Sequence, residues 1–176
     1  MGIRHQAKTV SVGCAIAAAL LLTPAIVSAQ KIATDWDKTA TFTGYQTYTL
    51  VRGEIPTGAS PLMVQRIEAA VESELSALGL LKTDKGADLS IAYHAATRAD
   101  VSLQSWGYAP RWGGGQVDVN RVVTGTLMVD VVDAKAKKLV WRATASDTVS
   151  DNPQKNEKKI HKAVEKMFEK YPTAAK

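Results

Sequence analysis

Beyond the first thirty positions the chain has two histidines, His94 and His161, and they limit the catalysis or metal binding it could support. His94 falls on the polar side of a predicted strand, and His161 on the flank of a predicted helix. A zinc site usually needs four convergent His, Cys or carboxylate ligands, and neither histidine has such neighbours at a ligand spacing. We interpret both as surface or locally satisfied side chains, and we predict no metal and no cofactor.

The acidic pair Asp35 and Asp37 is the nearest approach to a catalytic motif, because both share one face of a predicted strand. Paired carboxylates act as general acid and base when their surroundings separate their pKa values. No nucleophile or third partner accompanies them, so we interpret them as groups that bind turn amides or nearby cations. Gly113-Gly114-Gly115 precedes a predicted strand rather than a helix, which argues against a phosphate loop. We predict no catalytic residue; the alternative is a hydrolase assembled from residues distant in sequence.

Binding is better supported, by a tryptophan- and glycine-rich stretch within the segment Thr97 to Asn120, which we expect to be the longest irregular loop. Trp, Tyr and Arg are the residue types that concentrate binding energy at interfaces, and glycines allow close backbone approach. The stretch could equally cap an open edge of the sheet. Both interpretations stay open here, and the candidate partner-binding residues are Trp106, Tyr108, Arg111 and Trp112.

A basic stripe along the last predicted helix offers a second surface. A cationic helix face can contact anionic lipid headgroups or envelope polymers. More commonly such a face is only solvated, and here Glu165 and Glu169 dilute it. Peripheral contact with an anionic envelope surface would use Lys155, Lys159, Lys162 and Lys166, with Lys170 beyond them.

Residues 1–29 have the pattern of a secretory signal peptide. Arg4 and Lys8 give a basic start, an apolar run follows, and small residues precede an expected cut between Ala29 and Gln30. Cys14, the single cysteine, comes before most of the apolar run, whereas a lipidated cysteine follows it. We therefore predict export to the periplasm in soluble form, in preference to a lipid-anchored state.

The remaining chain, residues 30–176, has the length of one domain and no cysteine, which excludes disulfides and thiolate chemistry. Without Arg4 and Lys8 the 22 basic residues become 20, against 17 acidic ones, so the net charge is +3. This weak excess is no nucleic-acid signature, and no nucleic-acid partner is predicted. The remaining partner is an unknown envelope protein or ligand.

A β-hairpin organises the elements that would position these residues. Two β-rich runs, from Arg121 to Thr148, flank the polar connector Asp133 to Lys138. Each alternates with a period of two, as a half-buried antiparallel strand requires. We expect the hairpin at the centre of a sheet, with Trp141 packed against helices and these inward positions: Val123, Gly125, Leu127, Val129, Val131, Leu139, Trp141, Ala143 and Ala145.

Two amphipathic helices and three further strands complete the pattern. One helix begins at Ser60-Pro61 and stops at Gly79; the other begins at Asn152-Pro153 and ends before Pro172. Strands are predicted over 32–37, 45–51 and 88–96. The order β-β-α-β-β-β-α predicts an α+β two-layer sandwich, in which two helices pack on one face of a mostly antiparallel sheet of about five strands.

With these elements in place, the chain resembles a bacterial family catalogued as domain of unknown function 4136. The resemblance covers nearly all of residues 30–176 and implies an exported envelope protein of unassigned biochemistry. Many members look like lipoproteins, and this chain departs from them in the position of Cys14. The matching pieces are Asp35-Trp36-Asp37, Phe42, Tyr45, Thr47-Tyr48, Ala87-Asp88-Leu89, Ala92-Tyr93-His94, Trp106 to Gly115, Gly125-Thr126-Leu127, Asp130, Val132-Asp133-Ala134, Leu139 to Ala143 and Ser150 to Pro153.

Overall fold

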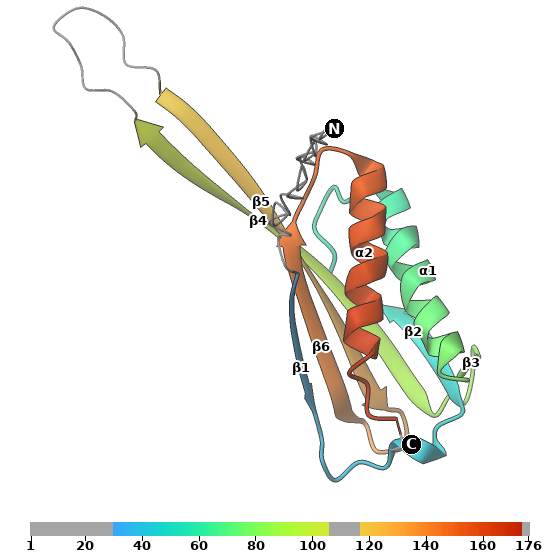
Figure 1. Ribbon diagram of the computed structural model, residues 1–176. Coiled ribbons are helices and arrows are strands. Elements are labelled where there is room, and N and C mark those ends of the chain that lie inside the picture. The colour runs from blue at the N-terminus through green and yellow to red at the C-terminus, as the bar shows by residue number, and fades with distance from the viewer. Residues whose placement is uncertain (1–29, 106–116, 174–176) are drawn as a thin grey trace, which may run out of the picture.

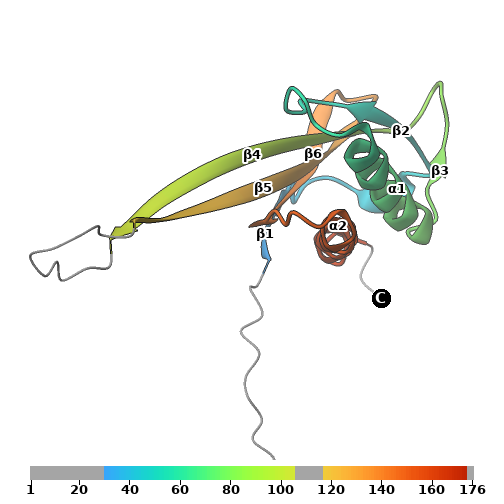
Figure 2. The same ribbon diagram turned by 90° about the horizontal axis from the view of Figure 1, so that it is seen from above.

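The computed structural model describes residues 30–105 and 117–173, and they form an α+β domain of two layers (Figure 1). Two helices lie side by side on one face of a six-stranded sheet, and Figure 2 shows the opposite face free of helices. The expected architecture is confirmed. In chain order the elements are β1 (Lys31–Trp36), a 3-10 turn (Phe42–Gly44), β2 (Thr47–Arg52), α1 (Pro61–Ala77), β3 (Leu81–Lys82), β4 (Leu89–Ser105), β5 (Val117–Asp133), β6 (Lys138–Thr148) and α2 (Pro153–Phe168).

The sheet has the order β1-β6-β5-β4-β2-β3, with the predicted β5–β6 hairpin at its centre. Pairing is antiparallel from β1 to β4 and parallel where β2 meets β4 and β3. The parallel step arises because α1 carries the chain across the sheet between β2 and β4, as parallel neighbours require. The sixth strand, β3, is a two-residue piece after α1 that the sequence pattern did not indicate.

The expectation of an irregular loop from Thr97 to Asn120 is wrong over most of its length. β4 and β5 stay paired from Leu89↔Asp133 out to Ser105↔Val117. The pairing of β6 with β5 ends at Thr124. On the other side of this point, β4 and β5 pair only with each other and form a two-stranded ribbon, called here the arm (residues 99–105 and 117–123). At about 3.3 Å per residue the arm projects about 20 Å from the body, as Figures 1 and 2 show. Trp106, Tyr108, Arg111 and Trp112 lie outside the described residues.

The core lies between the sheet and the helices and is built around Trp141, which is fully buried. Its ring centroid lies 5.3 Å from those of both Phe168 and Tyr171. The predicted inward alternation is confirmed for the hairpin with one exception. A bulge opposite Val131 and Val132 shifts the β6 register, so that Val140 is buried and Leu139 is 40% exposed.

Both helices begin at the end of the domain from which the arm leaves (Figure 1). Pro61 and Pro153 occupy their first turns, after the predicted caps Ser60 and Asn152. Asn152 Oδ1 accepts a hydrogen bond from the Lys155 amide at 3.0 Å, whereas Ser60 makes no side-chain cap. Because the helices run the same way, their N-terminal halves face the same part of the sheet. No helix within the described ranges is both long and apolar enough to cross a membrane.

Candidate binding cleft

The inward positions of the three central strands hold large side chains away from the arm, with Trp141 and Tyr93 both fully buried under the helices. Nearer the arm, Ala95 on β4, Gly125 on β5 and Ala145 on β6 are too small to reach the helix layer, and Leu127 lies level with both alanines. The inward series are Leu89, Ile91, Tyr93 and Ala95 on β4, Val131, Val129, Leu127 and Gly125 on β5, and Trp141, Ala143 and Ala145 on β6.

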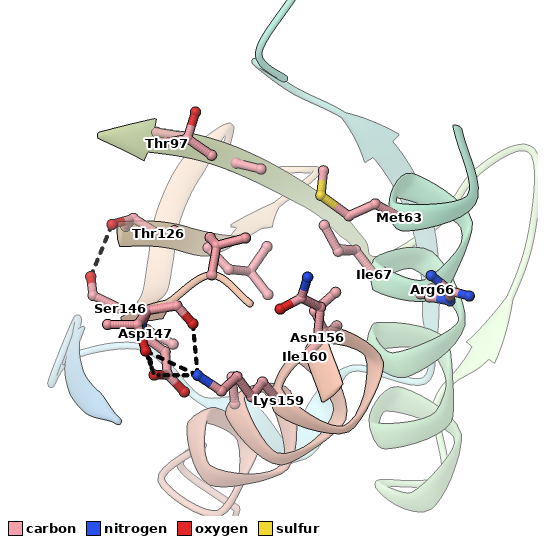
Figure 3. A pocket seen from close by; sticks show the side chains of 18 of the residues that line it. Met63, Arg66, Ile67, Thr97, Thr126, Ser146, Asp147, Asn156, Lys159 and Ile160 are labelled. Carbon is pink, nitrogen blue, oxygen red and sulfur yellow. Dashed lines mark hydrogen bonds and ion pairs between the residues drawn. The ribbon is translucent and has the colours of Figure 1, made fainter. Parts of the chain in front are cut away.

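A cleft of about 310 Å³ lies beside these small residues, between the sheet and the N-terminal halves of both helices (Figure 3). Its volume lies at the lower end of the range for small-molecule sites, which are mostly apolar. Met63 and Ile67 project into it from α1, and Ile160 from α2. Leu127 and Ala145 contribute the floor.

Gly125 lies at the arm end of the cleft, where Val149 takes the space that a side chain at residue 125 would need. A Cβ atom at this position would come within 3.0 Å of Val149 Cγ2, tighter than ordinary contacts between side chains. Val149 lines the cleft and is 42% exposed, and its amide donates to the Val123 carbonyl at 2.7 Å. The absence of a side chain at residue 125 therefore lets Val149 lie close over β5 at the entrance.

An ion pair between Lys159 and Asp147 borders one side of the cleft. Lys159 Nζ lies 3.1 Å from Asp147 Oδ1 and donates to the Thr148 carbonyl at 2.7 Å and to its hydroxyl at 3.1 Å (Figure 3). Burial by itself would raise the pKa of Asp147, but the hydrogen bonds from Lys159 and the Thr148 amide lower it below the usual value. The three protons of the ammonium group are thus all directed at protein oxygens.

The other polar groups at the rim are also engaged with each other. The Asn156 amide bonds both backbone groups of Ser150, at 2.8 and 2.6 Å. Arg66 Nε lies 3.1 Å from Glu157 Oε2. Thr126 and Ser146 share a hydroxyl–hydroxyl bond of 2.9 Å. Gln30 Oε1 is buried at the cleft without a hydrogen-bond partner, as is Trp141 Nε1 in the core among the described residues. The cleft therefore presents apolar surface with a rim whose charged groups are paired.

His94 lies on the open face of the sheet, away from the cleft, beside a buried carboxylate. Its Nδ1 accepts a hydrogen bond from the Glu54 amide at 3.0 Å, and its Nε2 lies 3.8 Å from Asp130 Oδ2. Asp130 is 7% exposed and binds Arg142 through two bonds of 2.6 Å. The hydrogen bond with Asp130 raises the pKa of Arg142. Both nitrogens of His94 thus face protein groups. The contacts of His94, Asp130 and Arg142 hold neighbouring strands together on this face of the sheet.

The acidic pair of the first strand behaves as the sequence suggested. Asp37 forms an ion pair with Lys138 at 2.5 Å and accepts bonds from the amide and hydroxyl of Thr39. The Lys138 bond, followed by those from Thr39, holds the pKa of Asp37 far below its usual value. Asp35 accepts a bond from the Trp36 amide at 2.9 Å. Within residues 30–105 and 117–173, no three His, Cys, Asp or Glu side chains gather as metal ligands would.

The basic stripe of the last helix divides into paired and exposed members. Lys159 is half-buried in the cleft rim and paired with Asp147, so it does not belong to an open cationic face. Lys155 and Lys162 are exposed, as is His161, and Lys166 is half-buried. Contact of this face with an anionic surface stays a prediction.

Sequence reasoning did not find the cleft, although its signal is present in the sequence. The inward positions of the hairpin were identified correctly apart from Leu139, and they include Gly125 and Ala145. The small side chain of Ala145, matched by Ala95 on β4, is the feature that leaves the space. Recognising it requires knowing that the three strands are neighbours and that both helices begin above that end.

Comparison with known proteins identifies the family of the chain. The family model described as "Domain of unknown function (DUF4136)" matches residues 32–173. No curated protein matches the chain. A PDZ domain protein from Parabacteroides distasonis shares the fold at 13% identity and a TM-score of 0.55, over 84% of this chain but 37% of that one.

Two further solved structures match less well. PelC from Paraburkholderia phytofirmans, solved as a dodecamer, has 13% identity and a TM-score of 0.49, over 79% of this chain and 94% of that one. A minor lipoprotein from Acinetobacter baumannii has 13% identity and a TM-score of 0.34, over 71% and 91% of the two chains. At these identities, similarity concerns the fold alone.

Proposed function

Because the chain belongs to the DUF4136 family, whose name assigns it no biochemistry, we propose a function from its own geometry. It is a non-enzymatic binding module of the bacterial cell envelope, and it holds an apolar group of a ligand or partner in the cleft between sheet and helices. The observation that carries this proposal is the 310 Å³ cleft lined by apolar side chains.

Packing density supports a guest in this space. Protein interiors contain few voids larger than a water molecule, because each one forfeits contacts between its lining atoms. Here the rest of the same layer is filled by Trp141, Tyr93 and Met167, all fully buried. The cleft remains beside this filled part because Ala95 and Ala145 carry small side chains.

The chemistry around the cleft favours binding over hydrolysis. A hydrolase needs a nucleophile or activated water, a base that orients it, and donors for the developing charge. The charged side chains at this rim, Lys159 with Asp147 and Arg66 with Glu157, are committed to each other. Export to the envelope rests on the pattern of residues 1–29, which lie outside the described residues.

Titration with N-phenyl-1-naphthylamine, an uncharged probe that fluoresces in apolar surroundings, tests the proposal. The purified protein should bind it saturably, and Ala145→Leu should weaken binding by about tenfold or more, because the new side chain occupies the cleft. Ala33→Leu is the matched control, since it adds the same atoms on the exposed side of β1 and should leave binding unchanged. Absence of saturable binding, or equal binding by Ala145→Leu, would refute the cleft as the site.

A further inference from the structure

The polar rim of the cleft restricts what kind of guest fits. Lys159 directs three bonds at Asp147 and Thr148, and Asn156 is engaged with Ser150. The rim charges cancel in pairs, Lys159 with Asp147 and Arg66 with Glu157. An uncharged apolar guest is therefore the electrostatic complement of this site, because it displaces no ion pair.

A peptide segment would need hydrogen-bond partners inside the cleft. Its backbone brings one N–H and one C=O per residue, and each needs a partner when it is buried. The charged side chains at the rim are paired with each other, and the buried acceptor Gln30 Oε1 could serve only one donor. Buried peptide groups would lack partners, which costs more than the apolar contacts of one side chain contribute. A hydrocarbon chain carries no such groups.

Resting on the function proposed above, we propose that the guest is a single acyl or alkyl chain of a lipid, whose head group stays outside the cleft. An apolar cavity of 150 Å³ holds one benzene, so 310 Å³ accommodates roughly a dozen carbon atoms. The uncovered side of the arm continues the cleft outward. Ala99 and Val123 are paired on the face that carries Leu127, followed by Val101, which is 60% exposed and lies opposite the exposed Arg121.

Displacement of bound N-phenyl-1-naphthylamine by defined alkyl compounds tests this assignment. In the series of 1-alkanols from hexanol upward, each added methylene should strengthen displacement about fourfold, until the cleft is full near twelve carbons. Decanol, decanoate and decyltrimethylammonium should agree within about fivefold, since the helix N-termini at this end favour the anion only weakly. Acetylated and amidated trileucine should be at least about tenfold weaker than decanol.

Three results would overturn the assignment of an alkyl-chain guest. Each differs from the result expected if the cleft binds nothing at all. Displacement by trileucine equal to that by decanol would indicate a peptide guest. A difference above about tenfold between the three decyl head groups would indicate a charged ligand recognised at the rim. Affinity that does not change with chain length would exclude a linear chain. If the probe itself does not bind the unmodified protein, the cleft is no binding site and the underlying function fails instead.

Discussion

Ala145 and Ala143 provide a matched pair of substitutions that tests whether the cleft is usable space. They occupy successive inward positions on β6 and differ in their surroundings. Ala145 is 5% exposed and lines the cleft, whereas Ala143 is fully buried and does not. Replacing either with leucine adds three carbon atoms. The same change therefore enters open space at residue 145 and filled core at residue 143.

The magnitudes follow from burial and packing. Three carbons at about 0.8 kcal/mol each give about 2.4 kcal/mol of transfer free energy. Fixing the leucine side chain costs about 0.5–1 kcal/mol. Ala145→Leu should thus raise the free energy of unfolding by about 1.5 kcal/mol. Ala143→Leu forces its atoms into packed surroundings and should lower it by about 1–3 kcal/mol.

Urea denaturation followed by tryptophan fluorescence measures both changes. The expected result is a higher transition midpoint for Ala145→Leu and a lower one for Ala143→Leu, with unchanged denaturant dependence in each. If Ala145→Leu loses as much stability as Ala143→Leu, the space at residue 145 is already filled. The inference that small side chains leave open space beside residue 145 would then be wrong.

Three further predictions concern the core, an acidic hydrogen-bond network and the aromatic stretch. Trp141→Ala should lower the free energy of unfolding by about 3–5 kcal/mol, as a large-to-small core change; a loss below about 1 kcal/mol in urea titration would contradict its central place. The folded-state pKa of Asp88 is lowered from 3.8, chiefly by the hydrogen bond from the Gln46 amide. The Asp88 carboxylate therefore contributes its full stabilisation above pH 3.8, and this stabilisation is lost as the pH falls through the folded-state pKa. The stability difference between the unmodified protein and Asp88→Asn should therefore narrow from about pH 6 to below about pH 3, and a constant difference in urea midpoints would exclude this linkage. Replacing Trp106 and Trp112 by alanine should leave the melting temperature nearly unchanged and remove a captured partner if these residues bind; a lower melting temperature with partners retained would assign them to capping the sheet.

Local alternation predicted those parts of the fold in which one face of a strand is buried. The period of two in the runs Val123 to Val131 and Leu139 to Ala145 placed the hairpin and the burial of Trp141 correctly, and the hairpin is central in the sheet as expected. The start of the last helix and the stop of the first could also be predicted from the sequence. Asn152 caps its helix through a local hydrogen bond, and Gly79 adopts the positive φ that ends the other. Such features depend on near neighbours in the chain.

The predictions that were wrong or missing concern features that depend on residues distant in the sequence. The arm was missed because its strands leave the helix layer, so burial no longer imposes a strong pattern there. Leu139 was assigned inward because a bulge is set by the partner strand, which shifts the phase by one residue. The cleft was missed for the same reason, since it depends on three strands and two helices that converge only in the fold.

The central claim is that an alkyl chain lies between the sheet and the helix N-termini, and methyl NMR spectra of the protein titrated with decanol test it most directly. Signals of Leu127, Ile67 and Ile160, which line the cleft, should shift and show contacts to the decanol protons. Signals of Ile91 and Val131, buried at the far end of the core, should stay in place. Shifts confined to residues outside the cleft, or none at all at saturating decanol, would contradict the claim.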